Sequence, residues 1–111
     1  MDEKNYVIFK KQYGYIKHPR VKELSINLNG VKIYEKEQSM IINIIVPVED
    51  STKTIQYFEE FNLGEDIHFN IAGTGDFECI FRGISPMIDK NSYSSFSITV
   101  QEKEAQDQMK G

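Results

Sequence analysis

The chain has 111 residues, of which 40% are hydrophobic and 27% charged, and its formal net charge is −4. This length allows one domain with a single core. No apolar run approaches the roughly 20 residues that span a bilayer, and no apolar segment near the N-terminus suggests a signal peptide. The single cysteine excludes an internal disulfide and a cysteine-rich zinc site. These features predict a cytoplasmic protein with no membrane partner.

Residues 1–22 differ in charge from the rest of the chain. They carry six lysine or arginine residues against two acidic ones, whereas residues 23–111 carry seven against fifteen. We therefore expect an N-terminal arm or edge strand at 1–22, one β-barrel-like domain at 23–102, and a polar, flexible tail at 103–111. The opposite charges predict either that the arm folds back on its own acidic domain or that it contacts a partner.

Aromatic and basic residues are interleaved in the N-terminal arm. Such a segment can stack on bases and grip phosphates, or it can form an edge strand whose aromatic side chains pack inward. Pro19 argues against a strand running through it. The candidate partner-binding residues are Tyr6, Phe9, Lys10, Lys11, Tyr13, Tyr15, Lys17 and Arg20.

A β-hairpin is predicted over residues 24–34. Residues 24–28 alternate between apolar and polar, residues 31–34 resume the alternation, and Asn29 and Gly30 lie between them. An Asn-Gly pair between alternating segments favours a type I′ turn, because both central positions of that turn need positive φ.

Residues 40–48 form the most apolar predicted strand. One face would hold Ile42 and Ile44, and the other Ile41 and Ile45. Two apolar faces are typical of a central strand whose outer face is also covered. We expect the segment that follows, a short helix at about 51–62, to cover that outer face.

The helix has a start signal, a stop signal and an apolar face. Asp50 and Ser51 can cap its first turn, and Gly64 can end it in the left-handed conformation. The apolar side chains recur at a spacing of three, which places them on one face of the helix. They are Ile55, Phe58 and Phe61.

Residues 63–102 predict a three-stranded antiparallel meander. Alternation in each strand indicates one buried face, residues 73–76 supply a glycine-containing turn, and Gly83 is a candidate bulge. The inward residues are Ile67, Phe69, Ile71, Phe77, Cys79, Phe81, Phe96, Ile98 and Val100. The fold class expected is mainly β, a small antiparallel β-barrel or sandwich of about six strands with one short α-helix.

The meander resembles the small β-barrel domain of phage-tail and contractile-injection hub or baseplate proteins. A Leu-Gly pair, a strand, a turn, a Phe-x-Gly-Ile segment, a loop and a final strand recur in that family. Leu63-Gly64, Phe81-Arg82-Gly83-Ile84 and residues 96–100 fill those positions here. The resemblance implies a non-enzymatic structural subunit that assembles into a ring or tube.

No residue pattern predicts catalysis, a cofactor or a metal site. The acidic residues Glu59, Glu60, Glu65 and Asp66 match no calcium loop and are expected to be solvated. His18 and His68 are isolated, which is too few ligands for a metal centre. Cys79 is expected to behave as a small buried apolar residue, and the Gly73-to-Asp76 segment is followed by a strand, which a phosphate loop is not.

The sequence therefore favours a non-enzymatic structural or assembly module that acts through a protein partner or by self-association. The alternative is an OB-like barrel that binds single-stranded nucleic acid through the N-terminal arm, although the acidic composition of the rest argues against it. A third hypothesis, a small molecule inside the barrel, is disfavoured because Phe and Ile side chains would fill so small an interior.

Overall fold

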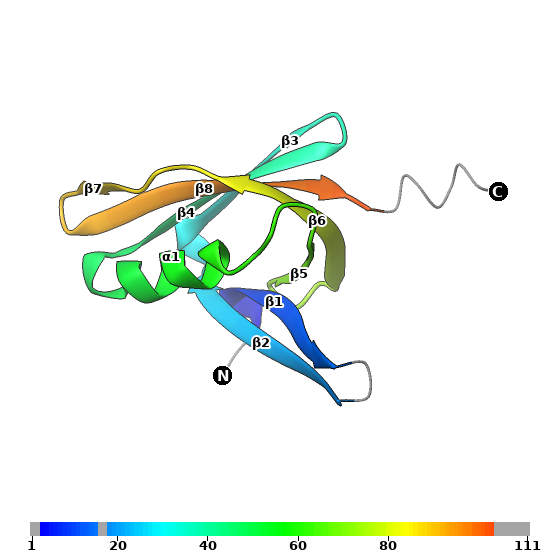
Figure 1. The fold of residues 1–111 in the computed structure, drawn as a ribbon. Helices are drawn as coiled ribbons and strands as arrows, with labels where there is room; N and C mark the ends of the chain where they lie inside the picture. The colour runs from blue at the N-terminus through cyan, green and yellow to red at the C-terminus, as the bar shows by residue number, and fades with distance from the viewer. Residues whose placement is uncertain (1–2, 16–17, 104–111) are drawn as a thin grey trace.

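The computed structural model describes the backbone of residues 3–15 and 18–103 (Figure 1). The side chains of residues 13–19 lie outside the described part. The strands are β1 (Tyr6–Tyr15), β2 (His18–Asn27), β3 (Val31–Lys36), β4 (Ser39–Pro47), β5 (Asp66–Ile71), β6 (Asp76–Ile84), β7 (Ile88–Lys90) and β8 (Tyr93–Glu102). The helices are the α-helix α1 (Ser51–Glu59) and the 3-10 helices η1 (Glu3–Asn5), η2 (Leu28–Gly30) and η3 (Val48–Asp50).

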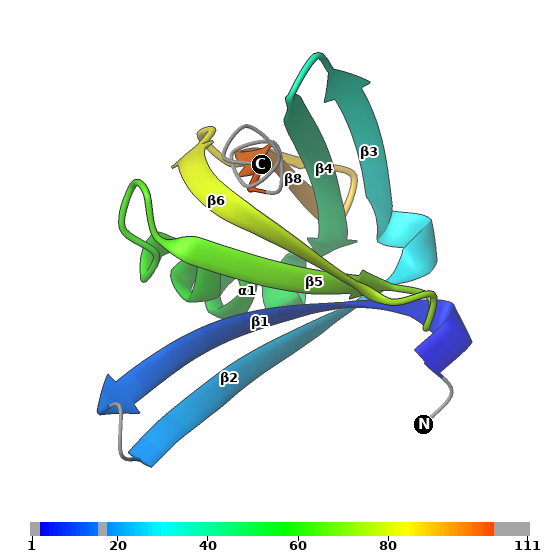
Figure 2. The same cartoon turned by 90° about the vertical axis from the view of Figure 1, so that its right-hand side faces the viewer.

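All eight strands belong to one antiparallel sheet with the order β2-β1-β5-β6-β8-β4-β3, and β7 pairs with β8. The prediction of a mainly β, antiparallel fold with one short α-helix is confirmed. The sheet has more strands than the six or so expected, and no ladder joins the edge strands β2 and β3, so it curves without closing (Figure 2).

The predicted meander is confirmed. Strands β5, β6 and β8 are neighbours in the sheet, and the register between β6 and β8 shifts between Phe81 and Gly83, which places a bulge at the predicted glycine. The inward residues are buried as expected, apart from Ile71, which is partly buried, and Phe77, which is 42% exposed at the start of β6 and stacks on Phe69.

The predicted hairpin at Asn29-Gly30 is wrong. Strands β2 and β3 lie at opposite edges of the sheet, and neither Asn29 nor Gly30 has positive φ. The side chain of Asn27 instead accepts a hydrogen bond from the Asn29 backbone N–H at 2.9 Å and starts η2. This 3-10 turn carries the chain from one edge strand to the other. A Cβ atom at Gly30 would collide with the carbonyl oxygen of Ile45, so close packing explains this glycine.

The expectation that Pro19 would interrupt a strand is also wrong. Pro19 is the second residue of β2, opposite Gly14. Since β2 is an edge strand, a residue without a backbone N–H is tolerated there. Strand β1 pairs with β2 along its whole length but with β5 only from Val7 to Lys10. Residues 11–15 and 18–22 thus form a two-stranded ribbon that extends beyond β5, and the boundary expected after residue 22 falls inside β2 (Figure 2).

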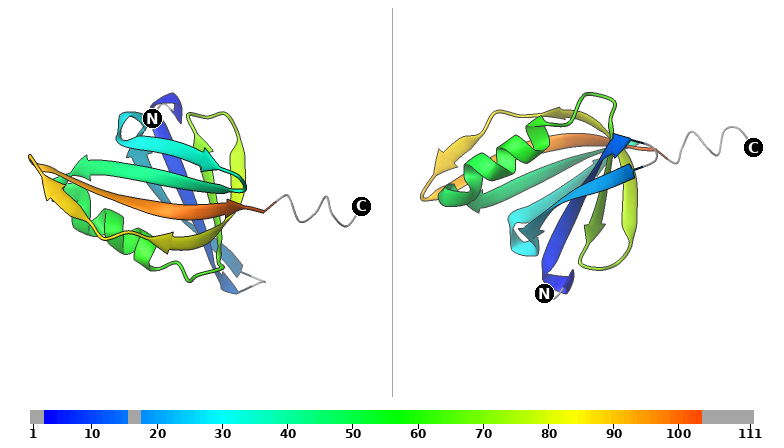
Figure 3. Two further views of the ribbon diagram at one scale, coloured as in Figure 1. Left: turned by 90° about the horizontal axis from the view of Figure 1, so that it is seen from above. Right: turned by 60° about the horizontal axis from the view of Figure 1, so that its bottom comes forward.

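Helix α1 is present at the predicted place but covers the inner face of the sheet, not the outer one. Its Phe58 lies 5.0 Å from Phe9 of β1 and 5.7 Å from Phe96 of β8, measured between ring centroids. Figures 1 and 3 show α1 on the concave side of the curved sheet, between the β1–β2 hairpin and the β4–β8 strands. The helix thereby fills the interior that a closed barrel would fill with strand side chains alone.

The start of α1 differs from the predicted cap. The side chain of Asp50 makes no capping hydrogen bond. Helix η3 leads directly into α1, and the hydroxyl groups of Ser51 and Thr54 donate to the carbonyl oxygens of Val48 and Asp50. Gly64 has the predicted left-handed φ, +89°.

Candidate interaction surfaces

The described residues of the predicted N-terminal site differ in burial. Phe9 is fully buried against Phe58 and Phe69, and Tyr6 is partly buried. Arg20 is exposed on β2. The remaining aromatic and basic candidates, Tyr13, Tyr15 and Lys17, lie outside the residues whose side chains are described.

The three described lysines of the β1–β2 hairpin are ion-paired within the molecule. Lys10 lies 3.4 Å from Asp76, Lys11 pairs with Glu65, and Lys22 lies 3.0 Å from Glu60. The Lys11 ammonium group also lies 4.9 Å from the centre of the Phe61 ring, close enough for a cation–π contact. The basic hairpin thus contacts acidic groups of its own domain, one of the two outcomes that its charge predicts.

Helix α1 also forms a hydrogen bond with strand β2 of the ribbon. The Tyr57 hydroxyl donates a hydrogen bond to the carbonyl oxygen of Lys22 at 2.9 Å. Burial, and secondarily the charges of Glu23 and Glu60, raise the pKa of Tyr57 above its usual value, which keeps the phenol protonated as a donor.

The outer face of the β3–β4–β8–β7 half-sheet carries a cluster of exposed apolar side chains that sequence reasoning missed as a site. On β4 the buried and exposed residues alternate, and Ile41 and Ile45 are each 40% exposed. Neighbouring strands extend the cluster, because Tyr34 lies opposite Ile41, and both Ile45 and Ile88 lie opposite Ser95. We call this surface the outer apolar face. Its members are Tyr34, Ile41, Ile45, Ile88 and Tyr93.

The sequence did contain a signal for this face. Both faces of residues 40–48 are apolar, which indicated that the outer one needed a cover. The nearby helix was assigned to that role, but α1 packs against the inner residues, so nothing in the described chain covers Ile41 and Ile45.

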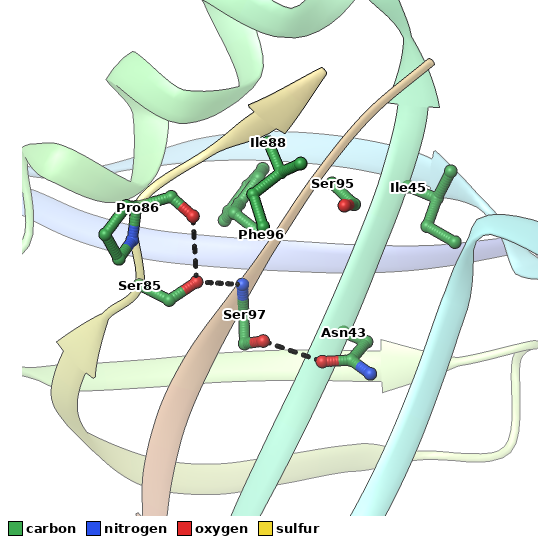
Figure 4. Close-up of a pocket in the computed structure, with 8 residues that line it drawn as sticks. All are labelled: Asn43, Ile45, Ser85, Pro86, Ile88, Ser95, Phe96 and Ser97. Carbon is green, nitrogen blue, oxygen red and sulfur yellow. Dashed lines mark hydrogen bonds between the residues drawn. The ribbon is translucent and has the colours of Figure 1, made fainter. Parts of the chain in front are cut away.

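A shallow groove runs through the outer apolar face along β8. The small side chains of Ser95 and Ser97 lie between the larger Ile45 on one side and Pro86 and Ile88 on the other (Figure 4). This difference in size leaves a pocket of about 210 Å³. We call it the β8 groove. Its lining residues are Asn43, Ile45, Ser85, Pro86, Ile88, Ser95, Phe96 and Ser97.

Hydrogen bonds fix the polar floor of the β8 groove. The Ser97 hydroxyl donates to the Asn43 side-chain oxygen at 2.7 Å, and the Ser97 backbone N–H donates to the Ser85 hydroxyl at 2.8 Å. Within the described part of the chain no hydrogen bond engages the Asn43 amide nitrogen, which remains a donor. The floor is therefore preorganised and offers an N–H donor to a bound group.

Basic side chains surround the outer apolar face. Lys32 and Lys36 alternate with Tyr34 on β3, and Lys90 follows Ile88 on the same side of β7. None of these lysines has an ion-pair partner among the described residues, and the outward positions of β3, β4, β7 and β8 carry no acidic side chain. Arg82, at the β6 bulge, donates to the Gln101 side chain at 2.9 Å. A net-acidic protein thus has a basic, apolar face.

Among the described residues, no three His, Cys, Asp or Glu residues gather into a possible metal site. Burial, with Glu102 nearby, raises the pKa of the Cys79 thiol to about 11, so the thiol is protonated at neutral pH. None of the helices described has the length and apolar character needed to cross a membrane.

The chain matches no protein-family model, no curated protein and no solved structure. Its own surfaces are therefore the guide to its function.

Proposed function

We propose that this protein is a non-catalytic assembly module that acts through protein–protein contacts made by the outer apolar face. The observation that carries the proposal is the concentration of exposed apolar side chains on one half-sheet. Ten large apolar side chains are exposed in the described chain, and five of them belong to this face. Contiguous apolar patches on a soluble domain mark interaction sites more often than chance exposure does.

The alternative function, binding of single-stranded nucleic acid by the N-terminal arm, has weaker support. Stacking needs accessible aromatic rings, and Phe9 is buried. Phosphate binding needs available positive charge, and Lys10 and Lys11 are engaged with Asp76 and Glu65. Salt-sensitive binding of an oligothymidine that Lys10→Glu with Lys11→Glu abolishes would favour this alternative.

Site-specific photo-crosslinking in the native host tests the proposal. A photoreactive amino acid is placed at Ile88, which is 65% exposed on the outer apolar face, and as a matched control at Leu63, which is 74% exposed elsewhere. We expect a discrete adduct from position 88 and none from position 63. The added mass identifies the partner, since an adduct of twice 12.9 kDa contains a second copy of the chain.

Equal adduct patterns from both positions, or no adduct from position 88, would contradict the proposal. A self-adduct would support assembly of identical subunits, as the resemblance to tail hub barrels implies. An adduct of another mass would identify a different protein as the partner.

A further inference from the structure

We infer that the β8 groove binds an extended, acidic segment of a different protein and accepts one of its apolar side chains between Ile45 and Ile88. This inference rests on the proposed function and specifies the partner of the same face. Three features of the groove support it: its shape, the hydrogen-bond donor on its floor and the charge around it.

The groove has the size and shape for a peptide side chain. Its volume of about 210 Å³ is below the roughly 300–1,000 Å³ of small-molecule sites. Ser95 and Ser97, which line it, are two residues apart on β8 and share a face. An extended peptide repeats with the same period of two, so every second side chain of a peptide lying along β8 faces the sheet.

The floor suits peptide chemistry. The amide nitrogen of Asn43 can donate to a peptide carbonyl or carboxylate, while the Ser97 hydroxyl holds the amide oxygen in place at 2.7 Å. The Ser97 hydroxyl, the Asn43 amide oxygen and the Ser85 hydroxyl are already hydrogen-bonded, so an apolar side chain entering the pocket leaves these three groups paired. The walls, Ile45 and Ile88, are 40% and 65% exposed and would be covered on binding.

The surrounding charge selects an acidic segment. Lys32, Lys36 and Lys90 stand on the same side of the half-sheet and lack ion-pair partners within the described residues. Like charges spaced around an apolar centre favour a partner of opposite charge and exclude basic segments.

Nucleic acid fits this face less well than an acidic peptide. Its two exposed aromatic residues, Tyr34 and Tyr93, lie opposite Ile41 and Pro47 of β4. Ile41 and Pro47 are six positions apart on β4, so the two tyrosines are separated by roughly 20 Å along the strand, at about 3.3 Å per residue. Tyrosines so far apart cannot stack on successive bases.

A second copy of the chain is also a poor occupant. The exposed large apolar residues outside the outer apolar face are scattered over separate elements. Four acidic side chains, Glu60, Glu65, Asp66 and Asp76, already have lysine partners in their own molecule. A second copy would therefore bring isolated apolar side chains to the groove and would have to break ion pairs to free these acidic groups. The scattered residues are Val21, Leu28, Val48, Leu63 and Phe77.

An NMR titration of the full chain tests the inference. The probe is a synthetic ten-residue peptide that alternates leucine and glutamate, and the control peptide alternates leucine and lysine. We expect the acidic peptide alone to shift backbone amide signals, and these shifts to be confined to β4, β8 and residues 85–90. Absence of shifts at millimolar peptide, equal shifts with the basic peptide, or shifts centred on another surface would overturn the inference.

Variants locate the interaction. Charge reversal of Lys32, Lys36 and Lys90 together should weaken binding about tenfold, which corresponds to about 1.4 kcal/mol or roughly 0.5 kcal/mol per lysine. Ile88→Ser should weaken binding as well. The matched controls, Lys53→Glu on α1 and Leu63→Ser, should bind like the wild type. Dispersed amide spectra confirm that each variant is folded. Unchanged affinity in both groove variants would reject the groove.

The two experiments can fail separately. A discrete crosslink from position 88 without peptide binding would keep the interaction face and reject an acidic segment as its partner. Shifts caused by an oligothymidine in place of the acidic peptide would reject a protein partner at this groove and assign the face to nucleic acid.

Discussion

The two faces of β4 carry the same residue type and meet opposite surroundings. Ile42 and Ile44 are fully buried beneath α1 and the inner residues of the neighbouring strands, whereas Ile41 and Ile45 are 40% exposed. On the inner face, isoleucine contributes to the free energy of folding through burial. On the outer face, an isoleucine at 40% exposure contributes less to folding and retains apolar area that a partner can cover. The comparison separates residues selected for the fold from those that we assign to binding.

The largest effect is expected where the inner face meets the helix. Phe58→Ala removes a fully buried ring that contacts Phe9 and Phe96, and it should lower the free energy of unfolding by about 3–5 kcal/mol. Urea denaturation followed by circular dichroism measures this loss. Phe77→Ala, at a ring that is 42% exposed, is the matched control and should cost much less. Equal losses would mean that α1 is not a main part of the core.

The comparison within β4 can be tested directly. Ile44→Ala should destabilise the protein by about 2–5 kcal/mol, because it leaves a cavity in the core. Ile45→Ala should cost about 1 kcal/mol or less, since much of that side chain is already in water. Urea midpoints of the two variants give the difference. If Ile45→Ala were as costly as Ile44→Ala, the outer isoleucines would be structural and their role in binding would lose its basis.

Strand alternation made much of this architecture predictable. The pattern in residues 66–71 and 93–102 reports which face is buried, and a one-residue register error would have reversed every side chain. Gly83 was recognised as a bulge because an isolated glycine after a strong strand has few other roles. These signals are local, so one sequence suffices to read them.

Features that depend on distant partners were not predictable. The Asn29-Gly30 pair has the composition of a hairpin turn, but β2 already pairs with β1 along its whole length, and the chain must pass to the other edge of the sheet. The same limit applies to α1. Of its predicted apolar residues, Phe58 is buried and Ile55 is partly buried, while Phe61 is buried just after the helix ends. Which face of β4 the helix covers depends on Phe9 and Phe96, which lie far away in the sequence. Because the helix is expected on the outer face of β4, the sequence alone does not single out the outer apolar face as a site.

A smaller effect is expected at the corner between η2 and β4. Gly30→Ala places a Cβ atom against the Ile45 carbonyl oxygen, and the resulting shift should cost about 1–3 kcal/mol. The change in the urea midpoint measures it. Gly75→Ala is the comparison variant. No atom lies near the Cβ position of Gly75, but its φ is +125°, so this substitution tests backbone strain and not a steric clash. A neutral Gly30→Ala would show that β4 can move outward, and the outer apolar face would then be adaptable, not rigid.

The smallest effect concerns the inner face of β6 and appears only at high pH. Burial raises the pKa of the Cys79 thiol from 9.0 to about 11. The folded state therefore favours the neutral thiol, and its contribution to stability is complete below pH 9 and is lost as the pH rises toward 11. Cys79→Ala should lower the overall stability but flatten this part of the pH dependence, as measured by urea denaturation at pH 8 to 11. The raised pKa of Tyr57 acts in the same direction in both proteins, so the difference between them isolates the thiol. Parallel pH curves would mean that Cys79 ionises as freely in the folded chain as in the unfolded one, which is incompatible with a dry inner face at β6.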